Sequence, residues 1–122
     1  MIRTEGLTHI HLVVRDVERS LRFYREVFGM EELFREGPAM VFLRTRGAED
    51  TVTLNADPAL HHLAGDGGGV QHVGFRLVEK DDLDDAIEQV VAAGGRLLRR
   101  GEHEPGHPFA YVADPDGYTL EL

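Results

Sequence analysis

The sequence contains no cysteine and no tryptophan, and Lys80 is its only lysine. Without cysteine the chain cannot form disulfide bonds, thiolate metal sites or a cysteine nucleophile. Its apolar runs fall far short of the roughly 20 residues that span a bilayer. The first residues also lack the apolar stretch of a signal peptide. We therefore expect a cytoplasmic protein that does not enter a membrane.

Negative charge dominates the chain: 22 acidic side chains stand against 13 basic ones, which gives a formal net charge of −9. A chain of this charge, with no basic stripe, is poorly suited to bind nucleic acid or an anionic membrane. Hydrophobic residues make up 42% of the 122 residues, so the chain is too apolar to be disordered and can build a buried core. The composition indicates an ordinary globular protein.

The two halves of the chain repeat one pattern of elements. Each half opens with an apolar segment typical of a strand, at 7–14 and 70–77, and His9 and His72 hold the same place in these segments. A segment with helical spacing follows in each half and ends at a glycine, the residue that most readily adopts the left-handed conformation after a helix. These glycines are Gly29 and Gly94. Three short apolar segments with strand character come next in each half, roughly at 30–35, 39–44 and 51–56, and at 96–100, 109–113 and 118–122.

This repeat predicts an α+β fold of two tandem βαβββ modules, in which a curved mixed sheet carries the helices on its outer face. The modules cover about 1–64 and 70–122, and the glycine-rich segment 65–69 links them within a single domain. Neither module can bury its sheet well alone, so we expect the two to pair. The sheet face opposite the helices, here called the free face, would then be open to a ligand.

Alternation along the strands places two histidines and a carboxylate on the free face. His9 and His72 occupy it on the two opening strands, and Glu121 does so on the last strand. Two imidazoles and one carboxylate form the facial set that holds a divalent ion and leaves positions open for a substrate. The set suits Fe(II), Mn(II), Zn(II), Ni(II) or Co(II). In the alternative without a metal, each of the three is simply a hydrogen-bonded polar group.

Three segments resemble the vicinal oxygen chelate superfamily: Thr8-His9-Ile10, the run from Asp16 to Tyr24, and the run from Tyr111 to Leu122, which contains the turn signal Asp-Pro-Asp-Gly. The superfamily comprises glyoxalase I, fosfomycin-resistance thiol transferases, extradiol ring-cleaving dioxygenases, methylmalonyl-CoA epimerase and bleomycin-binding proteins. The resemblance extends over essentially the whole chain and implies the paired βαβββ fold known from glyoxalase, bleomycin-resistance and dioxygenase proteins.

The same resemblance implies a metal site and a substrate class. The superfamily's ligand positions match His9, His72 and Glu121, and its substrates are small molecules that chelate the ion through two adjacent oxygens. For a chain of this length the resemblance implies a homodimer. In that dimer His9 of one subunit completes a site with His72 and Glu121 of the other.

The position of the fourth metal ligand separates glyoxalase-like members from the rest. Those members carry a glutamate or histidine on the last strand of the first module, where this sequence has Thr53. Threonine is a poor ligand and cannot shuttle a proton as a carboxylate does. Alternation places Thr53 and Asn55 on the free face, so we expect both to line the substrate pocket together with His11. Glyoxalase I chemistry is therefore the less favoured alternative.

The spacing of His103, Tyr111 and Glu121 resembles the signature of extradiol ring-cleaving dioxygenases, although that pattern has a larger apolar residue in place of Ala110. The resemblance implies an Fe(II) enzyme in which His103 or Tyr111 hydrogen-bonds the substrate or acts as acid or base. The other interpretation is that His103 only belongs to a polar loop held by prolines and a glycine.

Two other functions stay open. A glyoxalase I-like lyase or a thiol-transfer resistance enzyme would use the same metal site. A fosfomycin-type phosphonate substrate also needs a cationic loop, for which Arg76, Arg99 and Arg100 are the only candidates. A metal-free protein that sequesters a cationic drug such as bleomycin would need no ligands, and the net charge of −9 would attract its drug. His61 and His62 are expected in a loop just before the glycine-rich linker, where most histidines are simply solvated, and they are candidates for a lid over the pocket.

Overall fold

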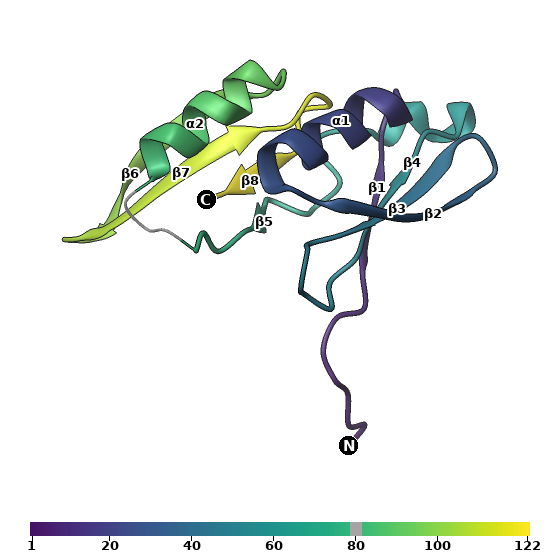
Figure 1. Cartoon of the computed structure of the whole chain (residues 1–122), viewed down its shortest axis with the longest axis horizontal. Helices are drawn as coiled ribbons and strands as arrows, with labels where there is room; N and C mark the ends of the chain where they lie inside the picture. Colours follow the sequence, from purple (N-terminus) through teal and green to yellow (C-terminus); the bar gives the residue numbers. More distant parts are fainter. Residues whose placement is uncertain (79–81) are drawn as a thin grey trace.

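The structure is a computed structural model that describes residues 1–78 and 82–122. Its elements follow the order of two βαβββ units with a 3₁₀ helix, η1 (Pro58–Leu63), between them (Figure 1). The first unit consists of β1 (Ile10–Val13), α1 (Val17–Phe28), β2 (Glu31–Glu36), β3 (Met40–Arg44) and β4 (Val52–Asn55). The second consists of β5 (Val73–Gly74), α2 (Leu83–Ala92), β6 (Arg96–Glu104), β7 (His107–Ala113) and β8 (Thr119–Glu121). Within the described residues, no helix is both long and apolar enough to cross a membrane.

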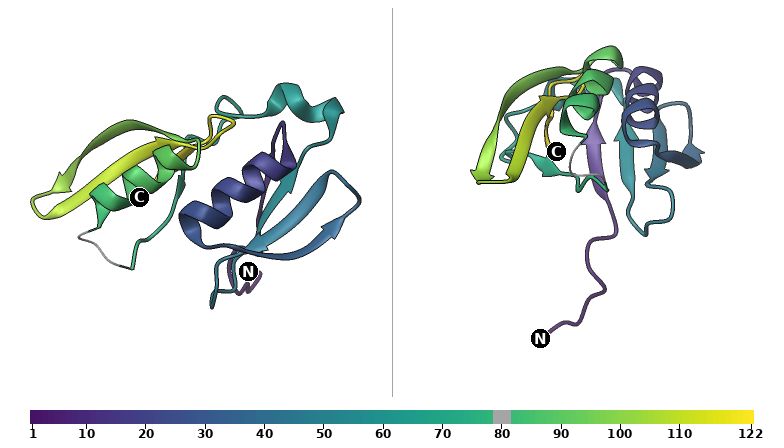
Figure 2. Two further views of the ribbon diagram at one scale, coloured as in Figure 1. Left: turned by 45° about the horizontal axis from the view of Figure 1, so that its top comes forward. Right: turned by 60° about the vertical axis from the view of Figure 1, so that its left-hand side comes forward.

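The strands form two four-stranded sheets, in the orders β1-β4-β3-β2 and β5-β8-β7-β6. The first strand of each unit runs parallel to the last, β1 beside β4 and β5 beside β8, and the other neighbours are antiparallel. Helix α1 packs on β3 and β4, helix α2 packs on β6 and β7, and the two helices touch each other (Figures 1 and 2). The predicted α+β fold, with mixed sheets and outer helices, is confirmed.

Both helices end as the sequence predicts. The Asp16 side chain caps the start of α1 by accepting a hydrogen bond from the backbone N–H of Arg19 at 2.9 Å. Gly29 ends this helix with a φ of 61°, in the left-handed region. Gly94 follows α2 with a φ of 95°. The apolar side of each helix is buried against the sheets, through Val17, Leu21, Phe23 and Tyr24 of α1 and through Leu83, Ile87 and Val90 of α2.

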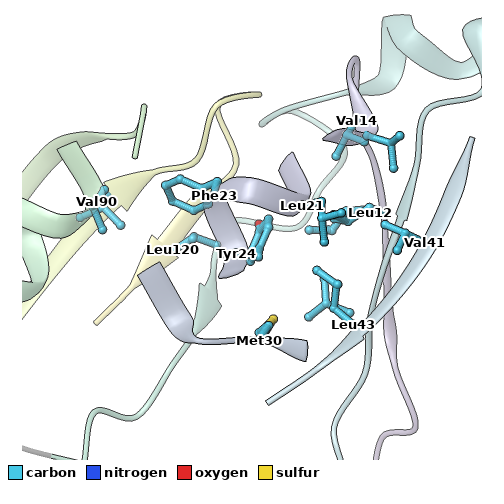
Figure 3. Packing of buried hydrophobic residues seen from close by; sticks show 14 of the residues in the cluster. Leu12, Val14, Leu21, Phe23, Tyr24, Met30, Val41, Leu43, Val90 and Leu120 are labelled. Carbon is cyan, nitrogen blue, oxygen red and sulfur yellow. The ribbon is translucent and has the colours of Figure 1, made fainter. Parts of the chain in front are cut away.

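One hydrophobic cluster takes side chains from both units (Figure 3). Phe23 and Tyr24 lie in its middle, between Val90 and Leu120 of the second unit and Leu43 of the first. Both rings are fully buried and meet edge to face, with centroids 5.2 Å apart. Burial of one such side chain stabilises a fold by about 1.5–3 kcal/mol. Helix α1 therefore joins the cores beneath the two sheets.

The strands of the second unit differ in length from the prediction. The opening strand expected at 70–77 is shorter: only Val73 and Gly74 pair as a strand, opposite Leu120 and Glu121 of β8. Strands β6 and β7 are longer than expected and meet at Pro105-Gly106, where Gly106 has a φ of 82°. Proline followed by a glycine with positive φ suits a type II turn. His103 consequently lies on a strand and not in a loop, in a hairpin that extends to one side of the molecule (Figure 1).

Asp116, in the turn between β7 and β8, ties the second unit to the first. Its fully buried carboxylate accepts hydrogen bonds from the backbone N–H of Arg15 at 3.0 Å, the Arg19 guanidinium at 2.9 Å and the Ser20 hydroxyl at 3.0 Å. A carboxylate can be buried only where such donors replace water. The sequence indicates the turn, but nothing in it shows which donors this carboxylate meets.

Asp114 makes a second buried connection between the units. The Tyr24 hydroxyl donates a hydrogen bond to Asp114 Oδ2 at 2.9 Å, and the Tyr118 hydroxyl donates one to the Val13 carbonyl at 2.7 Å. Burial raises the pKa of Asp114 above its ordinary value, although the hydrogen bond from Tyr24 acts in the opposite direction. Burial also raises the pKa of Tyr24 well above its ordinary value. In both groups the loss of water disfavours the charged form.

Candidate metal centre

Glu121 on β8 is flanked by two histidine rings on the free face of the second sheet. His72 Nε2 lies 2.9 Å from Glu121 Oε2, and His103 Nε2 lies 2.7 Å from Glu121 Oε1. The side chains of Glu121 and His72 are 23% and 28% exposed, so a small molecule can reach both. The structure thus brings together two of the three predicted ligands and adds the predicted catalytic histidine.

Strand register accounts for this arrangement. Gly74 pairs with Glu121 across β5 and β8, so His72, two residues before Gly74, lies on the same face as Glu121. His103 comes from β6, two strands away, where a β-bulge shifts the register against β7. A bulge leaves one residue unpaired and changes the direction of a side chain. Here the His103 ring meets the Glu121 carboxylate.

Gln71 fixes the orientation of the His72 ring. Its side-chain oxygen lies 2.8 Å from His72 Nδ1. When Nδ1 carries the proton it donates this hydrogen bond, and Nε2 then presents a lone pair toward Glu121. Histidines that ligate a metal usually hold their other ring nitrogen in this way. Strand alternation does not indicate Gln71, although a polar residue next to a candidate ligand is a usable signal in the sequence.

The His72–Glu121 pair fits two neighbouring ligands of one divalent ion. Such ligands lie about 2.1 Å from the ion, so two of them at right angles are about 3 Å apart. His72 Nε2 and Glu121 Oε2 are 2.9 Å apart. Among residues 1–78 and 82–122, no group of three or more histidine, aspartate or glutamate side chains is arranged to hold a metal. One chain therefore supplies a pair of ligands but not the predicted three.

His9 lies apart from this pair, at the exposed residue just before β1. It borders a largely apolar groove of about 480 Å³ between β1 and β5, lined also by Phe28, Val73 and Phe75. Both β1 and β5 are edge strands of their sheets, so one side of each has no neighbouring strand within the described chain. Such edges can pair with another chain.

The predicted pocket residues of the first sheet lie on its free face. Thr53 on β4 stands opposite His11 of β1 and Phe42 of β3, as the alternation predicts. Thr53 has no exposed surface, and its hydroxyl oxygen has no hydrogen-bond partner in the described part of the chain. Asn55 Oδ1 accepts a hydrogen bond from the backbone N–H of Asp57 at 3.0 Å. His11 is exposed and Asn55 is half-buried, so a ligand can reach both, whereas Thr53 is covered by its neighbours.

His61 and His62 lie on η1 and not in an irregular loop. Pro58 stands in the first turn of this 3₁₀ helix and the Asp57 side chain caps its start. His61 Nε2 forms a hydrogen bond with the Ala56 carbonyl at 3.0 Å, which holds the ring against the preceding segment. Asp57 followed by Pro58 is typical of a helix start, so the sequence does contain a signal for a short helix where a loop is expected.

Two aromatic rings of β7 complete the free face beside Glu121. The Tyr111 ring lies 5.2 Å from the His72 ring and 5.2 Å from the Phe109 ring, measured between centroids. The His103 ring stacks on Phe109 with a centroid separation of 4.2 Å. Both predicted catalytic residues, His103 and Tyr111, therefore border the His72–Glu121 pair.

Comparison with known proteins gives consistent matches. A family model described as the Glyoxalase/Bleomycin resistance protein/Dioxygenase superfamily matches residues 6–122. The chain is 29% identical over 116 residues to the manganese-dependent 2,3-dihydroxybiphenyl 1,2-dioxygenase of Geobacillus genomosp. 3, a match that covers 93% of this chain and only 35% of that enzyme's length. It is 35% identical over 127 residues to a lactoylglutathione lyase of Neisseria meningitidis serogroup A, a match that covers 95% of this chain and 88% of the lyase.

A solved structure shares the fold. The glyoxalase-related enzyme of Fulvimarina pelagi superposes with a TM-score of 0.77 at 28% sequence identity, over 97% of this chain and 86% of that one. The family model spans both βαβββ units of this chain, including the positions of His72 and Glu121. The chain belongs to the glyoxalase/bleomycin resistance protein/dioxygenase superfamily.

Proposed function

We propose that the protein is a divalent-metal-dependent enzyme of the vicinal oxygen chelate type, which binds a small substrate through two adjacent oxygens. The observation that supports this most directly is the Glu121 carboxylate between the imidazole nitrogens of His72 and His103, at 2.9 and 2.7 Å. A hydrogen bond from His72 Nδ1 to Gln71 Oε1, which lie 2.8 Å apart, would leave His72 Nε2 available as a metal ligand. The dioxygenase relative is manganese-dependent by name, which supports a divalent ion here.

The proposed active form is a homodimer in which His9 of one subunit completes the site of the other. Within one chain, His9 stands outside the cluster formed by His72 and Glu121. β1 and β5 border a common groove. The outer edge of each, on the side away from β4 or β8, has no strand partner among the described residues, so a second copy can pair there. Two-fold symmetry would then produce two identical sites.

The chain's own groups would position the substrate and move its protons. A bound divalent ion supplies Lewis-acid stabilisation of negative charge on a substrate oxygen. His103, with a side chain 57% exposed, can accept a proton from a substrate hydroxyl and return it later. Tyr111 stands opposite Glu121 across β7 and β8, where its phenol can donate a hydrogen bond to the bound substrate.

Extradiol ring cleavage with Fe(II) is the reaction we favour, and Mn(II), Ni(II), Zn(II) and Co(II) suit the same ligands. The contact of His103 with Glu121 and the likeness to a ring-cleaving dioxygenase support it. A glyoxalase I-like reaction is the second candidate, because the lyase relative matches over nearly its whole length. Against it, the buried Thr53 supplies neither a fourth ligand nor a proton-transfer group.

The first test is the metal content per subunit, measured by mass spectrometry on protein purified anaerobically without a chelating column. We expect about one divalent ion per pair of His72 and Glu121. Iron together with oxygen uptake on a catechol panel would support ring cleavage, and other ions would favour isomerase or transferase assays. The double variant His72→Ala, Glu121→Ala should lose both ion and turnover, whereas His107→Ala, at the hairpin end, should keep both.

A mixing experiment tests the shared site. The variants His9→Ala and His72→Ala should each be inactive, but a mixed dimer contains one intact site. Equal mixing should therefore restore about a quarter of the wild-type activity. A site built within one chain would give no recovery. If the wild-type protein takes up no divalent ion at all, the enzyme proposal is wrong and a metal-free drug-binding protein becomes the better explanation.

A further inference from the structure

Phe109 is the centre of a row of side chains on the free face of the second sheet. Arg99, Gly101 and His103 follow one another on β6, and Gly101 pairs with Phe109 of β7. The Phe109 ring lies directly over Gly101, because a Cβ at that glycine would stand 3.0 Å from ring atom Cζ. Although the helix that packs on β6 and β7 within the described residues, α2, lies on the opposite face of the sheet, the ring is only 5% exposed.

Arg99 and His103, which flank Gly101 on the same face of β6, both pack against the Phe109 ring. His103 stacks on it at 4.2 Å, and the guanidinium carbon of Arg99 lies 5.5 Å from its centroid. A guanidinium held over an aromatic ring by a cation–π interaction forms no hydrogen bond with that ring, so its N–H groups stay available to a ligand. Phe109 therefore positions Arg99 without using its hydrogen-bonding capacity.

Arg99 differs from its neighbour Arg100 in its partners. Arg100 lies on the helix side of the sheet and pairs with Asp84 of α2 at 2.5 Å. No ion pair within residues 1–78 and 82–122 involves Arg99, even though the chain contains 22 acidic residues. A positioned guanidinium without a carboxylate partner, next to candidate metal ligands, is suited to receive an anion from a ligand.

Register connects Arg99 to the candidate metal centre. Arg99 pairs with Tyr111, and Tyr111 pairs with Glu121, so the three stand in one line across β6, β7 and β8. Strands in a sheet are about 4.8 Å apart, which separates the backbones of Arg99 and Glu121 by about 10 Å. A small ligand that lies over Tyr111 can therefore contact the Glu121 site at one end and Arg99 at the other.

We propose that Arg99 binds a carboxylate group of the substrate. The same substrate would bind, through two other, adjacent oxygens, the divalent ion ligated by His72 and Glu121. The inference deepens the proposed function and rests on it, since both concern one site. The planar fork of the guanidinium matches a carboxylate through two parallel hydrogen bonds. Arg99 would then select anionic substrates over neutral ones of the same shape, with Phe109 and Gly101 as positioning residues.

The first arm of the test uses metal-free protein, so it does not depend on the metal. We would titrate 3-phenylpropanoate and the neutral 3-phenylpropanamide while following the arginine Nε–Hε signals by NMR. The acid should shift the Arg99 signal and bind about tenfold more tightly than the amide. The variant Arg99→Gln should lose that preference, Arg99→Lys should keep part of it, and the control Arg100→Gln should keep all of it.

The second arm uses Mn(II)-loaded protein and calorimetry with 3-(3,4-dihydroxyphenyl)propanoate and its methyl ester. The acid should bind about 10–100-fold more tightly than the ester, and Arg99→Gln should remove this difference without changing the affinity for Mn(II). Equal binding of acid and ester by the wild type, or an unchanged preference in Arg99→Gln, would overturn the Arg99 proposal.

The two arms also separate the two proposals. If the carboxylate preference appears in both arms but the diol adds no affinity over 3-phenylpropanoate in the metal-loaded protein, the chelate function fails and the Arg99 site stands. If the diol binds more tightly than the unhydroxylated acid but the carboxylate adds nothing, the Arg99 site fails and the chelate function stands.

Discussion

Two carboxylates close together in the sequence, Asp116 and Glu121, have opposite surroundings. Asp116 is fully buried and accepts hydrogen bonds from the Arg19 guanidinium, the Ser20 hydroxyl and the backbone of Arg15. Glu121 is 23% exposed and contacts two imidazole nitrogens. The donors around Asp116 are a backbone N–H, a hydroxyl and a guanidinium, none of which ligates a divalent ion in this way, whereas an imidazole nitrogen is a common metal ligand.

The difference separates a structural carboxylate from a reactive one. The hydrogen bonds of Asp116 are made with residues distant in the sequence, and they hold the two units together. Glu121 and His72 keep accessible surface and a geometry that a cation completes. We therefore expect changes at Asp116 to alter stability, and changes at Glu121 to alter metal binding.

Asp116→Ala should have the largest effect. It leaves the Ser20 hydroxyl and the Arg15 backbone N–H without their partner, and the partly exposed arginine side chains lose theirs. We expect the free energy of unfolding to fall by about 3 kcal/mol, measured by urea denaturation. The metal affinity of the remaining folded protein should not change. Asp66→Ala, at an exposed position, is the control, and an equal loss there would show that Asp116 has no special role.

Glu121→Gln should have the second largest effect, a loss of metal-binding free energy nearly as large as the loss of unfolding free energy in Asp116→Ala. The amide keeps the shape of the side chain but removes the charge that the ion requires, so affinity should fall by about 100-fold or more. Stability should stay within about 0.5 kcal/mol of the wild type. Metal titration and thermal denaturation measure the two effects, with Glu102→Gln on β6 as the matched control. Unchanged metal affinity in Glu121→Gln would contradict its role as a ligand.

Tyr24→Phe tests the second buried connection and should have a smaller effect. It removes the hydroxyl that donates to Asp114 Oδ2, which leaves that buried oxygen without this donor. We expect a loss of about 1–2 kcal/mol in unfolding free energy. Tyr111→Phe, on the free face, should lower the unfolding free energy by less. A larger loss in Tyr111→Phe than in Tyr24→Phe would show that the Tyr24 hydroxyl adds little stability.

The pH dependence should show the smallest effect. Burial raises the pKa of Tyr24 well above its ordinary value, so the folded protein keeps this proton at a pH where the unfolded chain has lost it. The resulting stability is fully present below the unfolded pKa of about 10 and is lost as the pH rises above it. We would measure the free energy of unfolding at several values between about pH 8 and 11. It should fall with rising pH less steeply in Tyr24→Phe than in the wild type. An identical slope in both proteins would contradict the assigned pKa shift.

Much of the candidate site follows from strand alternation alone. Alternation correctly places His72 and Glu121 on one face, because Gly74 and Glu121 pair in register. It does not predict that His103 reaches Glu121, since that contact needs a hairpin longer than the apolar pattern indicates and a bulge within it. The ligand role of His9 stays a prediction, because it depends on a second chain.

The sequence by itself determined the repeated βαβββ order and the ends of α1, at Asp16 and Gly29. These features depend on local periodicity and on the backbone preferences of single residues. Only the tertiary structure decided that Asp116 binds Ser20 and that Arg99, unlike Arg100, faces the candidate metal centre. Such contacts depend on register, bulges and the packing of segments far apart in the chain, which no local pattern encodes.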